Sequence, residues 1–196
     1  MSPQDENSYF QKLNRHPLFR AAKYFFIALC IVVPFRIFIA QPFIVSGSSM
    51  APTFNANEYL VIDEISYRRH KPLRGDVIVF RYPLDPSIYF IKRVVAIPGD
   101  IVTISQGAVH VIDPNTGAHL LAEVYRSPFR NQKDTSTTTL GSDEYFTLGD
   151  NREESSDSRI WGPLQERFIL GKPFLRLLPF SRMSFLPGED NFSKNW

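Results

Sequence analysis

The hydrophobic positions of the chain follow two patterns that change near residue 41. Residues 24–35 carry no charge, and the apolar run extends over 21–40 with Lys23 and Arg36 as its two charges. A helix rises about 1.5 Å per residue, so a run of this length spans a hydrocarbon core of roughly 30 Å. We therefore predict a transmembrane helix over 21–40, with both cations near its ends, where long side chains can reach the headgroups.

Two other interpretations of this run remain open. A cleaved secretory signal peptide fits less well, because Phe38 stands two residues before Ala40, at a place where a small residue is expected. A buried core helix would need more apolar partners than so small a domain offers. The pattern favours an uncleaved signal anchor.

The basic residues around the run predict its orientation. Lys12, Arg15 and Arg20 precede it, whereas the first basic residue after it is Arg68. By the positive-inside rule the N-terminus lies in the cytoplasm and the chain after the span lies outside it. We expect a cytoplasmic segment over 1–20, the signal anchor over 21–40, an extracytoplasmic catalytic β domain over 41–182 and a C-terminal tail over 183–196.

Beyond residue 41, short segments rich in Val, Ile, Tyr and Phe alternate with Gly and Pro breaks, which is typical of strands. The expected strands are Glu58–Ile65, Asp76–Tyr82, Tyr89–Ile97, Asp100–Ser105, Ala108–Ile112, Tyr145–Leu148 and Arg167–Leu178, the last of which could be part helix. The polar, Thr-rich residues 113–143 predict a long hairpin tip or surface loop. The predicted fold class is mainly β: an antiparallel β-sheet or barrel-like domain with one N-terminal transmembrane helix.

Composition narrows the function classes. The chain has 196 residues and a net charge of +2, and its Lys and Arg residues are scattered among nearly as many acids, so no nucleic-acid partner is indicated. Cys30 is the single cysteine, which excludes an intrachain disulfide and a Cys₄ or Cys₂His₂ zinc site. The four histidines show no metal-ligand spacing, so we expect neither a metal nor a cofactor.

Three polar segments carry candidate chemistry. Ser46–Thr53 is a cluster of small residues followed by Met-x-Pro, and residues 149–159 read GDNREESSDSR. Between them, Lys92 shares one face of its predicted strand with Phe90 and Val94. Desolvation by such apolar neighbours lowers the pKa of a lysine, and a neutral lysine can take the proton of a serine hydroxyl. Taken singly, each segment is also typical of a solvated loop or an edge-strand lysine.

In this order the segments resemble the signature boxes of bacterial type I signal peptidases, also called leader peptidases. The resemblance runs from residue 41 to residue 159 through Gln41-Pro42-Phe43, Ser49-Met50-Ala51-Pro52-Thr53, Arg74-Gly75-Asp76, Lys92-Arg93, Pro98-Gly99-Asp100 and the GDNREESSDSR segment. It implies a Ser-Lys dyad protease in which Ser49 is the nucleophile and Lys92 the general base. It also implies that Ser155 orients the lysine ammonium and that Asp157 and Arg159 form a structural ion pair beside the site.

Further expectations follow from the same resemblance. The backbone N–H of Ser49 would form part of the oxyanion hole, whereas the second donor is open, because Gly47 stands where some relatives have a serine. The residues matching the pockets for small side chains are Phe43, Val45, Met50, Phe54, Val79 and Ile91. The implied substrates are secretory preproteins with small-x-small cleavage sites. The implied location is the inner (cytoplasmic) membrane, with phospholipid contact, a single pass and a monomeric enzyme.

Two alternatives remain open at this stage. A specialised relative that matures a pilin in a conjugation system would have the same dyad and a different substrate. A non-catalytic, membrane-anchored binding module would use the β domain to hold a partner, although the joint presence of Ser49, Lys92 and Ser155 argues against it. The self-cleaving SOS repressors share the Ser-Lys logic, but they carry a DNA-binding domain where this chain has the apolar run.

Overall fold

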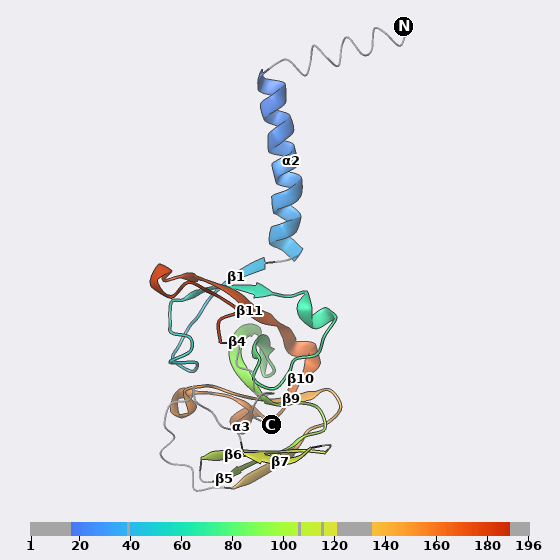
Figure 1. The fold of residues 1–196 in the computed structure, drawn as a ribbon, viewed down its shortest axis with the longest axis vertical. Coiled ribbons are helices and arrows are strands. Elements are labelled where there is room, and N and C mark those ends of the chain that lie inside the picture. The colour runs from blue at the N-terminus through green and yellow to red at the C-terminus, as the bar shows by residue number, and fades with distance from the viewer. Residues whose placement is uncertain (1–16, 39, 106, 115, 121–134, 189–196) are drawn as a thin grey trace. The chain divides into compact units, whose positions relative to one another are not determined.

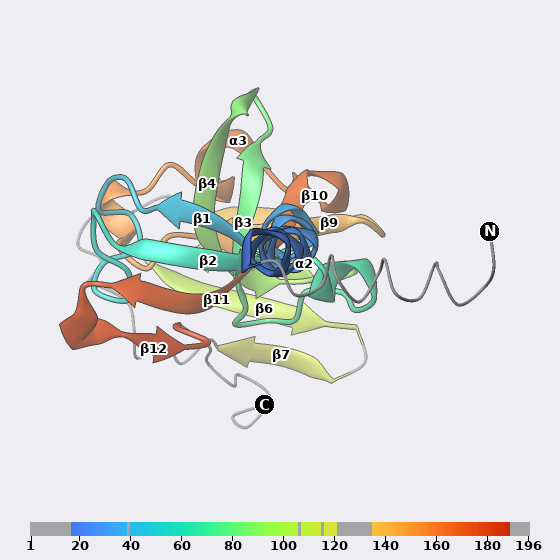
Figure 2. The same ribbon diagram turned by 90° about the horizontal axis from the view of Figure 1, so that it is seen from above.

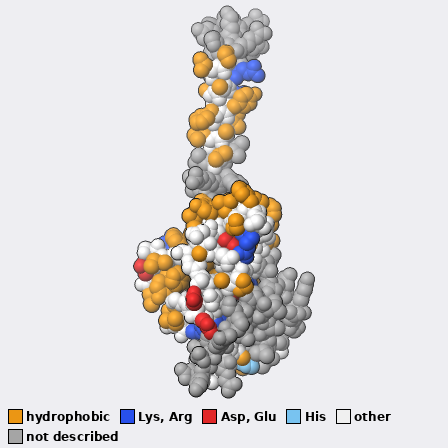
Figure 3. Space-filling model, turned by 90° about the vertical axis from the view of Figure 1, so that its left-hand side faces the viewer, with side chains coloured by type: hydrophobic (Ala, Val, Ile, Leu, Met, Phe, Trp, Pro, Cys, Tyr) orange, Lys and Arg blue, Asp and Glu red, His pale blue; other side chains and the backbone are white. Residues whose placement is uncertain are grey.

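The computed structural model describes residues 17–38, 40–105, 107–114, 116–120 and 135–188. The chain divides into two compact units, Met1–Ala40 and Gln41–Trp196. The first unit contains the helix α2 (Pro17–Phe38), drawn in blue in Figure 1. Apolar side chains lie along this helix in Figure 3, and the large exposed ones are Leu18, Tyr24, Phe25, Phe26, Ile27, Leu29 and Val32. None of the helices in the described ranges is both long and apolar enough to cross a membrane.

The second unit is built on a large antiparallel sheet. Its strands are β1 (Ala40–Ile44), β2 (Tyr59–Asp63), β3 (Val77–Tyr82), β4 (Asp85–Ala96), β9 (Glu144–Leu148), β10 (Leu164–Gln165), β11 (Ile169–Leu178) and β12 (Ser184–Phe185). The order is β1-β2-β11-β3-β4-β9-β10. The short strand β12 is not part of this path and pairs with the second half of β11. Figure 2 shows β1, β2, β11 and β12 side by side. For the described strands this order is an open path with two edges rather than a closed barrel.

A second, smaller sheet contains β5 (Ile101–Ser105), β6 (Ala108–Asp113), β7 (Gly117–Leu120) and β8 (Ser136–Thr139) in the order β7-β6-β5-β8. The prediction of a loop over 113–143 was therefore wrong at β7 and β8, while residues 121–134 lie outside the described residues. The physical reason is that Thr is β-branched and favours strands, and it pairs here with an apolar strand, Val102 opposite Thr138. Gln106, expected in the turn between β5 and β6, also lies outside the described residues.

Short helical segments complete the domain. They are η1 (Ser66–Arg68), η2 (Arg152–Glu154), α3 (Ser158–Trp161), η3 (Glu166–Phe168) and η4 (Phe180–Arg182). The segment 167–178, predicted as a strand with a possible helical part, begins in the η3 turn and continues as β11. The segment expected as a tail begins with β12, and its residues 189–196 lie outside the described part of the chain.

Core packing fixes β3 and β4, the strand pair that contains Lys92. Val77 and Val79 of β3 pack on one face of the sheet, with residues from the β1–β2 connection. Ile78 and Phe80 of the same strand pack on the opposite face. A strand that is buried on both faces has a continuous apolar sequence without alternation. β3 is such a strand, and it pairs with β4. The end of β4 continues into the core of the small sheet through Val95 and Ala96.

Candidate active site

Ser49 lies in the connection between β1 and β2, just beyond the point where the chain leaves the sheet. The segment that precedes Ser49 is hydrogen-bonded to the start of the next strand, because the N–H of Val45 donates to the carbonyl oxygen of Glu58 over 3.0 Å. Beyond it, Met50 and Phe54 are almost fully buried, at 1% and 0% exposure. The serine is therefore held between a paired strand end and two core side chains, although it lies in a turn.

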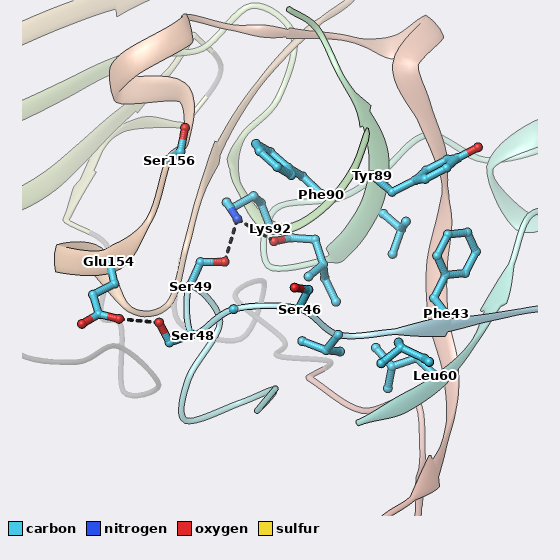
Figure 4. A pocket seen from close by; sticks show the side chains of 15 residues that line it. Phe43, Ser46, Ser48, Ser49, Leu60, Tyr89, Phe90, Lys92, Glu154 and Ser156 are labelled. Atoms are coloured by element: carbon cyan, nitrogen blue, oxygen red, sulfur yellow. Dashed lines mark hydrogen bonds between the residues drawn. The ribbon is translucent and has the colours of Figure 1, made fainter. Parts of the chain in front are cut away.

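Lys92 brings a buried amine to this serine. It lies in β4 opposite Ile78, is 3% exposed, and its Nζ is 5.0 Å from the centre of the Phe90 ring. Nζ donates hydrogen bonds to Ser49 Oγ at 2.8 Å and to the Ile91 carbonyl oxygen at 3.0 Å, as Figure 4 shows. Burial lowers the pKa of Lys92 from 10.5 to about 8, although the carboxylates of Asp157 and Asp150 act in the opposite direction.

An ion pair beneath the site ties its segments together. Arg93, next to Lys92, donates from Nε and Nη2 to the two carboxylate oxygens of Asp150 at 2.9 and 2.8 Å, and both residues are 1% exposed. The Thr53 hydroxyl donates to the same carboxylate at 2.5 Å. Asp150 thus links the strand of the lysine to the loop of the serine, and a two-point Arg–carboxylate contact fixes orientation as well as distance.

The third polar segment packs directly against Ser49. The N–H of Asn151 donates to the Ser49 carbonyl oxygen over 3.0 Å. A Cβ placed on Gly149 would clash with the Ser155 side chain and lie 2.5 Å from the same carbonyl oxygen, so only glycine fits. Arg159 pairs with Asp157 at 2.7 Å, and Asp157 also accepts from the N–H of Gly149 at 3.0 Å.

Ser155 differs from its expected arrangement. Its side chain is buried, but Oγ has no hydrogen-bond partner among the described residues, and the expected bond to Lys92 is not formed. A buried hydroxyl without a hydrogen-bond partner destabilises the fold by about 1–3 kcal/mol, because its desolvation is not compensated.

A cleft of about 320 Å³ lies over the serine and the lysine (Figure 4). Four of the six residues expected to form substrate pockets line it, namely Phe43, Val45, Val79 and Ile91. Met50 and Phe54 do not line it: they belong to the core below, because the loop turns their side chains inward. Lining residues that the sequence analysis missed are Ile44, Ser46, Ser48, Leu60, Tyr89, Phe90, Glu154 and Ser156.

Some of the missed residues carried a usable signal. Ile44 and Phe90 adjoin residues that were predicted, and Tyr89 lies two residues before Ile91. Ser156 and Glu154 lie inside the polar segment already singled out. Leu60 carried no such signal, because an apolar residue in a strand is as typical of the core as of a substrate pocket.

A hydroxyl and a buried, partly neutral amine at hydrogen-bond distance in an open cleft are the arrangement of a serine hydrolase with a lysine base. Comparison with known sequences names the family. The family described as Signal peptidase, peptidase S26, matches residues 18–178. The chain belongs to this family of peptidases.

Individual relatives agree over most of their length. The chain is 32% identical over 233 residues to Signal peptidase I of Pseudomonas fluorescens, covering 94% of this chain and 81% of the relative. It is 35% identical to Probable signal peptidase I-2 of Synechocystis sp., covering 83% of this chain and 74% of the relative. The solved structure of a signal peptidase I from Enterococcus faecalis V583 matches 53% of this chain and 97% of its own, with 28% identity and a TM-score of 0.44.

Proposed function

We propose that the chain is a serine endopeptidase that removes N-terminal signal peptides from secretory preproteins. The observation that carries this proposal is the hydrogen bond between Lys92 Nζ and Ser49 Oγ inside a cleft with an apolar end. Membership of the signal peptidase family supports the substrate class. The apolar end suits the small side chains of an Ala-x-Ala site, because shallow pockets select such groups mainly by excluding larger ones.

The reaction proceeds through an acyl-enzyme. Ser49 Oγ attacks the scissile carbonyl carbon while neutral Lys92 takes its proton, and the tetrahedral oxyanion is stabilised by the backbone N–H of Ser49. Lys92 then gives this proton to the leaving amine as the C–N bond breaks. Water, deprotonated by the same lysine, hydrolyses the ester and frees Ser49.

The surrounding residues position this pair. Ser155 Oγ turns to the lysine ammonium once the proton has moved, which would give the unpaired hydroxyl its partner. Asp157 and Arg159 hold the segment that carries Ser155. Phe43, Val45, Val79 and Ile91 receive the small side chains before the cut, and Met50 and Phe54 shape this floor from below. Gly47 has no side chain that could donate, so the second oxyanion donor is a backbone N–H or a water.

We also propose that the apolar run over 21–40 anchors the enzyme in the inner (cytoplasmic) membrane, with 1–20 in the cytoplasm, the 41–182 domain and the 183–196 tail outside, and a monomer in contact with phospholipid. The exposed apolar side chains of α2 support an apolar surrounding. The basic residues before the run support the orientation. Protease added to intact spheroplasts should digest an epitope at residue 196 and spare one at residue 1, and the reverse pattern would contradict the orientation.

The enzymatic proposal is tested with a detergent-solubilised preprotein that has an Ala-x-Ala site. The full chain should cut at that site, while Ser49→Ala and Lys92→Ala should lose activity by at least about a thousandfold. Ser142→Ala and Lys71→Ala are matched controls on exposed residues away from the cleft, and both should cut normally. Equal cutting by all five proteins, or none by the unsubstituted chain, would contradict the proposal.

A further inference from the structure

The cleft has a polar end that the reaction does not use. Ser49 and Lys92 lie between two differently lined parts: Phe43, Leu60 and Tyr89 on one side, and Ser48 and Glu154 on the other (Figure 4). The Ser48 hydroxyl donates a hydrogen bond to Glu154 Oε2. The carboxylate is thereby held beside the residue that precedes the nucleophile, although Glu154 itself is exposed to solvent.

At the polar end of the cleft, Glu154 is the charged side chain that can face a substrate. Among the described lining residues, Glu154 is the one carboxylate and Lys92 the one cation. The cations of the neighbouring segment are turned to other partners, since Arg152 donates to the Gly149 carbonyl oxygen and Arg159 pairs with Asp157. The polar end therefore presents a negative charge to solvent.

The position of this charge relative to the scissile bond follows from the proposed function, on which this inference rests. If the side chains before the cut occupy the apolar end, the chain after the cut must pass Ser48 and Glu154. Side chains alternate between the two faces of an extended chain, so the third and first residues before the cut share a face with the second residue after it. That second residue is directed into the cleft, toward its polar end.

We propose that Glu154, held by Ser48, is a specificity-determining residue that favours a basic side chain at the second position after the cleavage site and disfavours an acidic one. The interaction is an exposed ion pair, so its effect is modest and falls with salt. It contributes to the choice among preproteins rather than to the bond-breaking step.

The test uses three preproteins with the same Ala-x-Ala site and Lys, Gln or Glu at the second position after it. The full chain should cut the Lys substrate about three- to fivefold faster than the Gln substrate in kcat/KM, the size that an exposed ion pair gives, with the Glu substrate slowest. Glu154→Gln should abolish this order and leave the Gln substrate unaffected. Glu153→Gln, the neighbouring carboxylate outside the lining, should preserve the order.

Two further measurements separate the explanations. The preference of the unsubstituted chain should shrink at 0.5 M salt, a test that needs no variant, and Lys at the first position after the cut should give no preference. An equal loss on all three substrates in Glu154→Gln would overturn the inference, because the Ser48 contact would then only fix the loop. Equal kcat/KM values of the unsubstituted chain on the three substrates would also overturn the inference. Failure to cut even the Gln substrate would instead refute the proposed function.

Discussion

Replacing Lys92 by methionine should make the protein inactive and, near neutral pH, more stable. Burial lowers the pKa of Lys92 from 10.5 to about 8, and one pKa unit corresponds to about 1.36 kcal/mol. Keeping the ammonium in the folded protein therefore costs about 3 kcal/mol. Methionine fills a similar volume without a charge, so it removes this cost, although it also removes two hydrogen bonds of about 1 kcal/mol each.

The pH dependence isolates the titration from the lost hydrogen bonds. Below pH 8 the folded and unfolded chains both carry the Lys92 proton, so the full cost is present. Between pH 8 and pH 10.5 the unfolded chain binds more proton than the folded chain, so rising pH stabilises the fold and the cost fades. Above pH 10.5 neither state is protonated and the cost is gone.

The assay is urea unfolding of the unsubstituted chain and of Lys92→Met at pH 7 and pH 10. The difference between their free energies of unfolding should shift by about 2 kcal/mol in favour of the unsubstituted chain between these pH values. Other titrating groups cancel, because both proteins carry them. A difference that stays constant with pH would refute the reasoning, since Lys92 would then titrate alike in both states. The kcat/KM of the unsubstituted chain should rise with pH and level off above about pH 8.

Three other substitutions test the supports of the site. Asp150→Asn leaves the Arg93 charge buried without its partner and should lower the free energy of unfolding by about 3–5 kcal/mol in urea; an unchanged midpoint would contradict a tight ion pair. Gly149→Ala should reduce kcat by at least about a hundredfold, because its Cβ displaces the Ser49 carbonyl, and normal kcat would show that the loop can yield. Ser155→Ala should leave the urea midpoint unchanged or higher, since it removes an unpaired hydroxyl, while lowering kcat more than tenfold; a parallel loss of both would point to a structural role.

The sequence predicted the strands best where apolar, β-branched residues are dense. β3 and β4 lie within about four residues of their predicted limits, because most of β3 and the end of β4 are buried and rich in residues that favour strands. β7 and β8, which both lie at edges of the small sheet, were missed. In β8 the reason is that its side chains are polar and mostly exposed, so they resemble those of a loop. The β11 neighbours β2 and β3 were not predictable either, since the order of strands depends on contacts distant in the chain.

The candidate site also contains residues that the sequence could indicate and residues that it could not. Residues with distinctive chemistry, such as Ser49 and Lys92, were singled out from motifs, and the structure brings these two within hydrogen-bond distance. Whether a side chain near them faces the cleft or the core could not, because the loop after Ser49 has no regular period, and Met50 and Phe54 proved to be core residues. Glu154 lies in the polar segment that the sequence singled out, but its contact with Ser48 could not be predicted, because the two positions are 106 residues apart and no local pattern encodes such a pair.

The carboxylate of Asp150 connects the geometry of the site with its chemistry. It binds Arg93, which adjoins the proposed base Lys92, and Thr53, which follows the proposed nucleophile Ser49. It therefore helps to set the separation of two groups that lie 43 residues apart in the chain. The same negative charge, together with the larger effect of Asp157, favours the protonated form of Lys92 and opposes desolvation. The fold thus places the base with charges that limit how far its pKa falls. Desolvation remains the larger effect, which leaves Lys92 with a pKa near 8, strong enough to accept the Ser49 proton and neutral in a useful fraction of molecules.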